Sequence, residues 1–221
     1  MRHFEEELAE LKSKLLEMSG LVESAIFRSV TALTTLDREL AKSVISNEEK
    51  INLMEIEIDD AATRLLALHQ PMASDLRFLT AAIKINNDLE RMGDLAVKIA
   101  ERALSLMEQP PVKPEIDIPQ VARLAESMVR RSLDAFVKRD SELARSVLTA
   151  DDEVDDLRSA IYEELIRNMQ AEPATIPQCV NLMSVVRSLE RIADHSTNIA
   201  EDVLYLVEGI DVRHHAETKR H

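Results

Sequence analysis

The chain has 221 residues, a formal net charge of −14, one cysteine, three glycines and no tryptophan. Scarce glycine beside abundant Leu, Ala, Glu and Arg indicates an all-α protein, and the acidic balance argues against a protein that binds nucleic acid through its phosphate backbone. A single cysteine, an N-terminus without a signal peptide's apolar core and no run near the ~20 apolar residues of a membrane span predict a cytoplasmic protein without membrane insertion.

Apolar residues at helical spacing predict three helices in a first unit, residues 1–108. The first helix covers residues 4–36, and the second follows Asp37, which we expect to be its N-cap. The third begins at a cap formed by Ser74 or Asp75, after a turn that contains Pro71, and ends near residue 108.

Residues 109–119 form a linker, because four prolines in eleven residues cannot lie inside a helix. A second unit, residues 120–209, repeats the plan with helices over 120–138, over 141–170 behind the cap Asp140, and from near Pro177 to 208. Gly209 is the expected C-cap of the last helix. Residues 210–221 are a polar tail.

The two units are copies of each other. Residues 21–44 match residues 124–147 at twelve of twenty-four positions, and residues 88–101 match residues 188–201 at seven of fourteen. The offset is 103 in the first two helices and 100 in the third. The chain is therefore interpreted as two tandem three-helix bundles.

The strongest motif is LERxxDxxxxIAE, which begins at Leu89 and again at Leu189. At ~100° per residue, its acids share one stripe of the third helix with aliphatic residues on both sides, a position that predicts burial against the bundle. A buried carboxylate must be paired, protonated or bound to a cation. The six acids of the two stripes are Glu90, Asp94, Glu101, Glu190, Asp194 and Glu201.

Three arrangements satisfy these acids. They bind metal, since acids four apart project side by side and oxygen ligands suit hard cations or iron. Alternatively they are salt-bridged by Arg28 and Arg131, by Arg64, or by the local Arg91 and Arg191. In the third arrangement they line a groove open to water.

Other polar residues are weaker candidates. Glu23 and Glu126 match each other and could add a ligand, and Asn87, Asn198 and His195 flank the motif. The acids of residues 151–156 are interpreted as a solvated helix face, Cys179 as a buried apolar residue, and the histidines of the tail as incidental. Glycine-rich phosphate loops, nucleophile motifs and the Glu-x-x-His spacing of di-iron bundles are missing, so we do not expect an enzyme.

The repeated motif, as LERMGDLAVKIAE and LERIADHSTNIAE in an acidic six-helix chain, resembles the PhoU family, over about residues 4–209. Its ExxxD pattern occurs as Glu90–Asp94 and Glu190–Asp194, with Ala193 where the first copy has Gly93. The resemblance implies two bundles related by a pseudo-twofold axis, frequent homodimers, and metal ions of iron, zinc or magnesium type on the acidic motifs.

The resemblance also implies a function. Members of this family are negative regulators of the phosphate-starvation response, with the ATPase subunit of the phosphate ABC transporter and a membrane sensor histidine kinase as partners. Two alternatives remain open from the residues. One is a purely structural helical protein with internally salt-bridged acids, and the other is a carboxylate-bridged metalloenzyme.

Overall fold

The computed structural model describes residues 2–112 and 116–209, so the polar tail predicted at 210–221 lies outside the described residues. Its elements are α1 (Arg2–Thr35), α2 (Arg38–His69), α3 (Ser74–Met107), α4 (Ile118–Lys138), α5 (Ser141–Ala171), the short 3₁₀ turn η1 (Pro173–Thr175) and α6 (Ile176–Glu208). The predicted all-α fold and its six long helices are confirmed.

The helix ends follow local chemistry. Asp37 and Asp140 accept hydrogen bonds from the backbone N–H of Leu40 and Leu143, as predicted for N-caps, and Gly209 ends α6 at φ 72°. The predicted cap of α3 is wrong. The cap position is Ala73, at φ 43° and without a side-chain hydrogen bond, because α3 already begins at Ser74.

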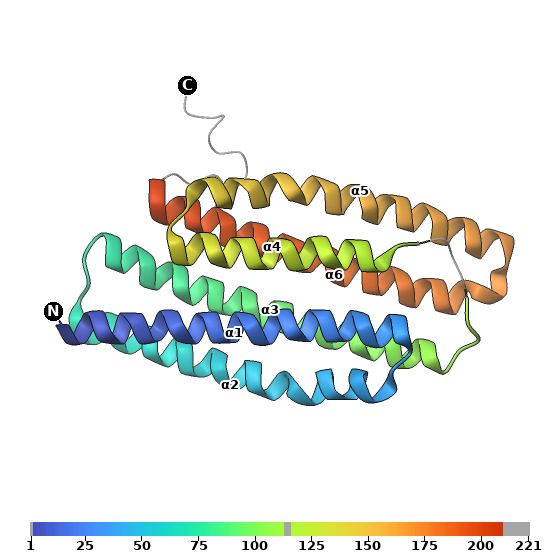
Figure 1. Cartoon of the computed structure of the whole chain (residues 1–221), viewed down its shortest axis with the longest axis horizontal. Helices are drawn as coiled ribbons and strands as arrows, with labels where there is room; N and C mark the ends of the chain where they lie inside the picture. Colours follow the sequence, from blue (N-terminus) through green and yellow to red (C-terminus); the bar gives the residue numbers. More distant parts are fainter. Residues whose placement is uncertain (1, 113–115, 210–221) are drawn as a thin grey trace, which may run out of the picture.

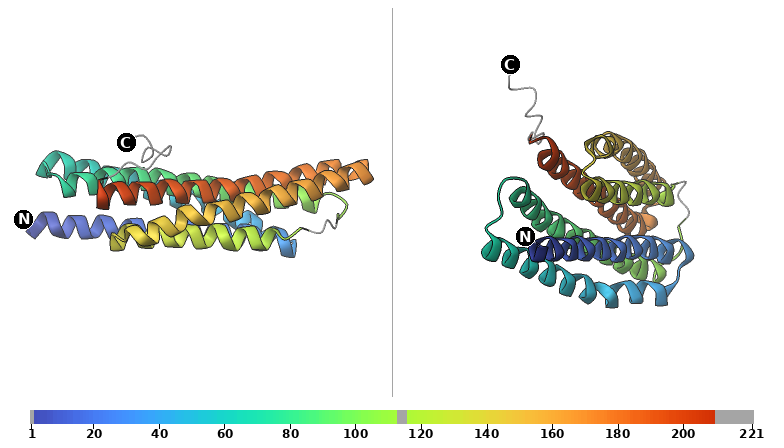
Figure 2. Two further views of the ribbon diagram at one scale, coloured as in Figure 1. Left: turned by 90° about the horizontal axis from the view of Figure 1, so that it is seen from above. Right: turned by 60° about the vertical axis from the view of Figure 1, so that its left-hand side comes forward.

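Each unit is a three-helix bundle, and the two bundles pack along their lengths (Figure 1). α3 contacts α6 and α1 contacts α4, while α2 and α5 lie on the outer sides of their units. Figure 2 shows α3 and α6 running alongside each other in the middle of the molecule. Buried apolar residues from all six helices form one continuous core.

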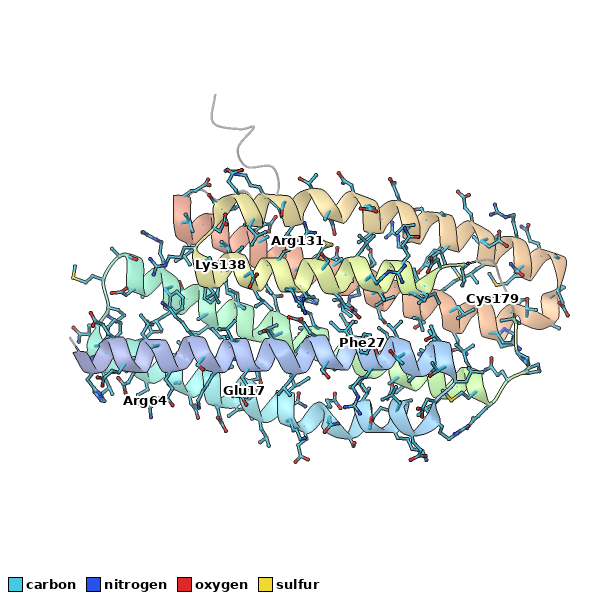
Figure 3. The ribbon with its side chains drawn as sticks, viewed as in Figure 1. Glu17, Phe27, Arg64, Arg131, Lys138 and Cys179 are labelled. Carbon is cyan, nitrogen blue, oxygen red and sulfur yellow. The ribbon has the colours of Figure 1, made fainter. Side chains whose placement is uncertain are left out.

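The core crosses the boundary between the bundles. The rings of Phe78 on α3 and Phe136 on α4 stack at 4.9 Å between centroids, and both are almost fully buried. Cys179 on α6 (Figure 3) is fully buried, so its predicted role as a small apolar residue is confirmed. No helix within the described ranges is long and apolar enough to cross a membrane.

Candidate metal site in two carboxylate clusters

The acids of the repeated motif do not lie on the face that fills the core, so that expectation is wrong. Glu90 and Asp94 are half-buried and Glu101 is exposed. Ile85, Met92 and Ile99 are fully buried and lie roughly opposite Glu90 at ~100° per residue. The aliphatic residues beside the acids suggested a core face because α3 is covered on three sides, by α1, α2 and α6. The acids lie on the edge of α3 that faces α2.

In the first unit the acids meet a carboxylate from α2. Burial raises the pKa of Glu48, and the charge of Asp94 together with a hydrogen bond to Asp94 raises it further. Burial also raises the pKa of Glu90, followed by the charges of Asp94, Glu55 and Glu48, against the local Arg91. We call Glu48, Glu90 and Asp94 the first carboxylate cluster.

The second unit repeats this arrangement between α5 and α6. Burial and the charge of Asp194 raise the pKa of Asp151 to about 6. Burial raises the pKa of Asp194, with the charge of Asp155 as the next cause. We call Asp151, Asp155, Glu190 and Asp194 the second carboxylate cluster. Asp151 stands at the position of Glu48, 103 residues later.

Glu48 and Asp151 were missed from the sequence. Asp151 had been interpreted as part of a solvated face together with its neighbours, and it is instead half-buried beside the motif. The offset of 103 carried the signal, because Glu48 and Asp151 are acids at equivalent positions of the two units. The amphipathic pattern could not show that these positions of α2 and α5 face the motif.

The two clusters differ in their counter-charge. In the second cluster, the guanidinium of Arg158 on α5 donates to Glu190 Oε1 at 2.7 Å and lies 3.5 Å from Asp155. The position equivalent to Arg158 in the first unit is Glu55. There Arg91 Nε lies 3.7 Å from Glu90 Oε2 with its side chain 57% exposed, and the positive charge of Lys98 acts on Glu48.

The predicted local salt bridge is confirmed for Glu90, whose partner is Arg91. Glu190 is also salt-bridged, but its partner is Arg158 and not one of the arginines named from the sequence. Arg28 donates to Ser43, and Arg131 donates to Ser146, in equivalent contacts that join the first and second helices of each unit. These two arginines hold helices together and do not bridge the motif.

The remaining candidates lie elsewhere. Glu23 and Glu126 line a groove of about 520 Å³ between α1 and α4, where Arg130 lies 3.2 Å from Glu23. Asn87, Asn198 and Glu201 line a separate hollow between α2, α3 and α6. At its edge His195 Nδ1 is 2.8 Å from Asp88 Oδ1, which joins α6 to α3.

The donor set of the first cluster suits a hard cation. Its ligand atoms are all oxygens, and its carboxylates repel one another. Asn52, one turn after Glu48 on α2, has a buried side-chain oxygen, Oδ1, without a hydrogen-bond partner. Asn52 is the residue equivalent to Asp155. Within residues 2–112 and 116–209, no three His, Cys, Asp or Glu side chains are yet close enough together to hold an ion. Binding of an ion by Glu48, Glu90 and Asp94 would therefore require these side chains to move closer together.

Close helix packing supports each cluster. A Cβ at Gly93 would come 3.1 Å from Ile51 Cδ1, so α2 approaches α3 where the first motif has glycine. The second motif has Ala193, and the residue equivalent to Ile51 is the smaller Val154. The extra methyl on one helix is thus matched by a missing methyl on its neighbour.

Comparisons with known proteins agree with this architecture. The family model described as the PhoU domain matches twice, over residues 15–103 and 118–203. The phosphate-specific transport system accessory protein PhoU homologs of Pseudomonas putida and Aquifex aeolicus are 42% and 41% identical, over 96% and 94% of this chain and 84% and 94% of their own.

Solved structures show the same fold. The crystal structure of PhoU from Pseudomonas aeruginosa has a TM-score of 0.90 at 41% identity, covering 94% of this chain and all of that one. The phosphate transport system regulatory protein PhoU from Streptococcus pneumoniae has a TM-score of 0.88 at 33% identity, covering 95% and 99%. With the domain matched in both halves and the repeated carboxylate clusters in place, this chain belongs to the PhoU family.

Proposed function

We propose that this protein is a non-enzymatic regulator of phosphate transport. Its response to the state of the transporter depends on cation-dependent packing of the helices within its two bundles. In this role it is a negative regulator of the phosphate-starvation response. It couples the ATPase subunit of a phosphate ABC transporter to a membrane sensor histidine kinase. Family membership supports the role in phosphate transport regulation, since the relatives are named as accessory proteins of that system.

The observation that carries the proposed cation dependence is the pairing of Glu48 with Asp94 across α2 and α3. Burial and the negative charge of Asp94 raise the pKa of Glu48, so the repulsion between these two carboxylates opposes the close approach of the helices. A divalent or trivalent cation of magnesium, zinc or iron type, held by Glu48, Glu90 and Asp94, would convert this repulsion into a link between the helices. Glu101 follows on the same helix edge and is the expected outer ligand.

The second cluster is the weaker cation site in this proposal. Arg158 already supplies a positive charge to Glu190 and Asp155, so a cation there must displace or share that guanidinium. For this cluster, internal salt bridging is the better-supported alternative, with Asp194 as an expected ligand only when Arg158 is removed. Glu201 lies in the separate hollow between α2, α3 and α6 and is not expected to bind a cation held by this cluster.

Exchanging the counter-charges tests the assignment. We expect Glu55→Arg to lower cation affinity at the first cluster and Arg158→Glu to raise it at the second, each by at least tenfold in titration calorimetry with Mg²⁺, Zn²⁺ or Fe²⁺. Exposed Glu153→Gln, one turn from Asp156 on the outer face of α5, is the matched control. Equal affinities in all four proteins would contradict the assignment.

The regulatory part is tested by co-purification. The full chain is mixed with the transporter ATPase and with the sensor kinase at high phosphate, with metal or with chelator. We expect the wild type to retain both partners in metal, and Glu48→Gln/Asp94→Asn to lose them. If both partners are retained equally with metal or chelator, and by the wild type and the variant, the protein is a purely structural interaction protein.

A further inference from the structure

A cavity of about 640 Å³ lies at the end of the molecule where the linker crosses from α3 to α4, away from both carboxylate clusters. It is lined mainly by apolar side chains from the ends of α1 and α3, from the linker and from the starts of α4 and α6. These include Leu33, Leu36, Leu106, Val112, Ile118 and Leu182. Its volume is within the ~300–1,000 Å³ of ordinary ligand pockets.

The pseudo-twofold relation explains why this cavity exists. At the opposite end of the molecule, Phe78 and Phe136 stack and fill the equivalent space. By the offsets of 100 and 103, their counterparts are Gln178 and Leu33, which both line the cavity. Two aromatic rings at one end are thus replaced by two smaller side chains at the other, and the volume is left open.

The cavity also contains unsatisfied hydrogen-bond acceptors. Gln178 is 5% exposed, and its Nε2 donates to the carbonyl of Pro110, but its Oε1 is buried without a partner. Oε1 of Gln109, also on the lining, is likewise buried and without a partner. A buried acceptor left unpaired costs ~1–3 kcal/mol, so an occupant that donates hydrogen bonds here recovers that cost.

The residue at the rim also differs between the two ends of the molecule. At the filled end, the guanidinium of Arg139 lies 5.9 Å from the Phe78 ring centroid. The residue equivalent to Arg139 is Leu36, which has the same left-handed backbone (φ 55° against 53°) and is 60% exposed beside the cavity. The open end therefore presents an apolar rim where the filled end presents a cation.

We propose that this cavity, which we call the linker pocket, binds an aromatic side chain that carries an N–H or O–H donor, on a basic segment of a partner protein. The ring takes the place that Phe78 occupies at the other end, and its donor satisfies Gln178 Oε1. The net charge of −14 of the whole chain favours encounter with a basic segment, although the pocket itself is lined by uncharged residues. Tryptophan and tyrosine are the side chains that combine these properties, and they are frequent anchors of interfaces.

The test uses a blocked Lys-Trp-Lys peptide and the same peptide with 1-methyltryptophan, which cannot donate. The chain contains no tryptophan, so indole fluorescence reports on the peptide without background. We expect a saturable blue shift with the first peptide and at least tenfold weaker binding of the methylated one. No saturable shift, or equal affinity for both peptides, would overturn the proposal.

Three variants locate the binding. Leu33→Phe/Gln178→Phe rebuilds the aromatic pair and should abolish binding while the melting temperature is kept or raised. Gln178→Met should reduce the affinity for Lys-Trp-Lys to that of the methylated peptide. Leu68→Phe, at an exposed position of α2, is the control and should bind as the wild type does.

Undiminished binding by the refilled variant would place the peptide elsewhere and overturn the proposal. A second outcome would also overturn it: sedimentation shows a dimer for the wild type and a monomer for the refilled variant. The occupant of the pocket would then be a second copy of this chain. The Gln178→Met comparison stays decisive if the double variant does not fold.

Discussion

Replacing Arg158 by methionine is the sharpest probe of the second carboxylate cluster. The guanidinium lies 2.7 Å from Glu190 Oε1, and the two side chains are 32% and 18% exposed. A fully exposed pair contributes ~0–1 kcal/mol, whereas breaking a fully buried pair costs ~3–5 kcal/mol. Breaking this half-buried pair also leaves Asp155 and Asp194 to repel Glu190, so we expect the free energy of unfolding to fall by about 2 kcal/mol, between these limits.

Such a loss lowers the melting temperature by roughly 4–8 °C in a chain of this size. It should be measured by urea unfolding in chelator. Arg167→Met, which removes an exposed pair with Glu164 on the same helix, is the control and should cost under ~0.5 kcal/mol. A cation added at ~100 times its dissociation constant should then restore about 2.7 kcal/mol to the Arg158 variant. A loss no larger than that of the control would refute the reasoning.

Three further predictions concern packing and charge. Gly93→Ala should lower the stability by about 1 kcal/mol although alanine has the better helix propensity, and Ile51→Val in the same chain should recover that loss. Additive effects of the two substitutions in a double-mutant cycle would contradict the matched packing. Phe78→Ala should cost ~3–5 kcal/mol in urea unfolding, and a loss under ~1 kcal/mol would show that the stacked pair does not hold the bundles together. Burial and the charge of Glu23 raise the pKa of Glu126, so its ionisation opposes folding. Glu126→Gln should therefore raise the melting temperature at pH 7, and this gain should disappear as the pH falls toward 4.5; a gain that is independent of pH would contradict this.

The helices and their repeat were predictable from the sequence because they depend on local signals. Asp37 and Asp140 are N-caps with an apolar residue three positions later, and Gly209 supplies the left-handed cap. The exception is Ala73 at the start of α3, whose positive φ is uncommon for a residue other than glycine and gives no signal in the sequence.

The site was predictable only in part, because it is made between helices. The motif located Glu90 and Asp94, but their partner Glu48 comes from α2, and α2 shows no motif of its own. Arg158 and Glu55 are equivalent positions of opposite charge, and only the contact of α5 with α6 shows that this difference falls on the cluster. A helical wheel assigns a face to each residue without stating which helix covers that face.

The linker pocket could not have been found from the sequence at all. Leu33 and Gln178 become informative only when Phe136 and Phe78 are seen stacked at the equivalent place. In both cases a difference between the two units distinguishes equivalent places: Glu55 stands where the second cluster has Arg158, and Gln178 stands where the filled end has Phe78.

Elemental analysis tests the central claim most directly. Wild type, Glu90→Gln/Asp94→Asn and Glu190→Gln/Asp194→Asn are purified without chelator, and their metal content is measured per chain. We expect metal in the wild type, its loss in the first variant and a smaller change in the second. Equal metal content in all three proteins would contradict it.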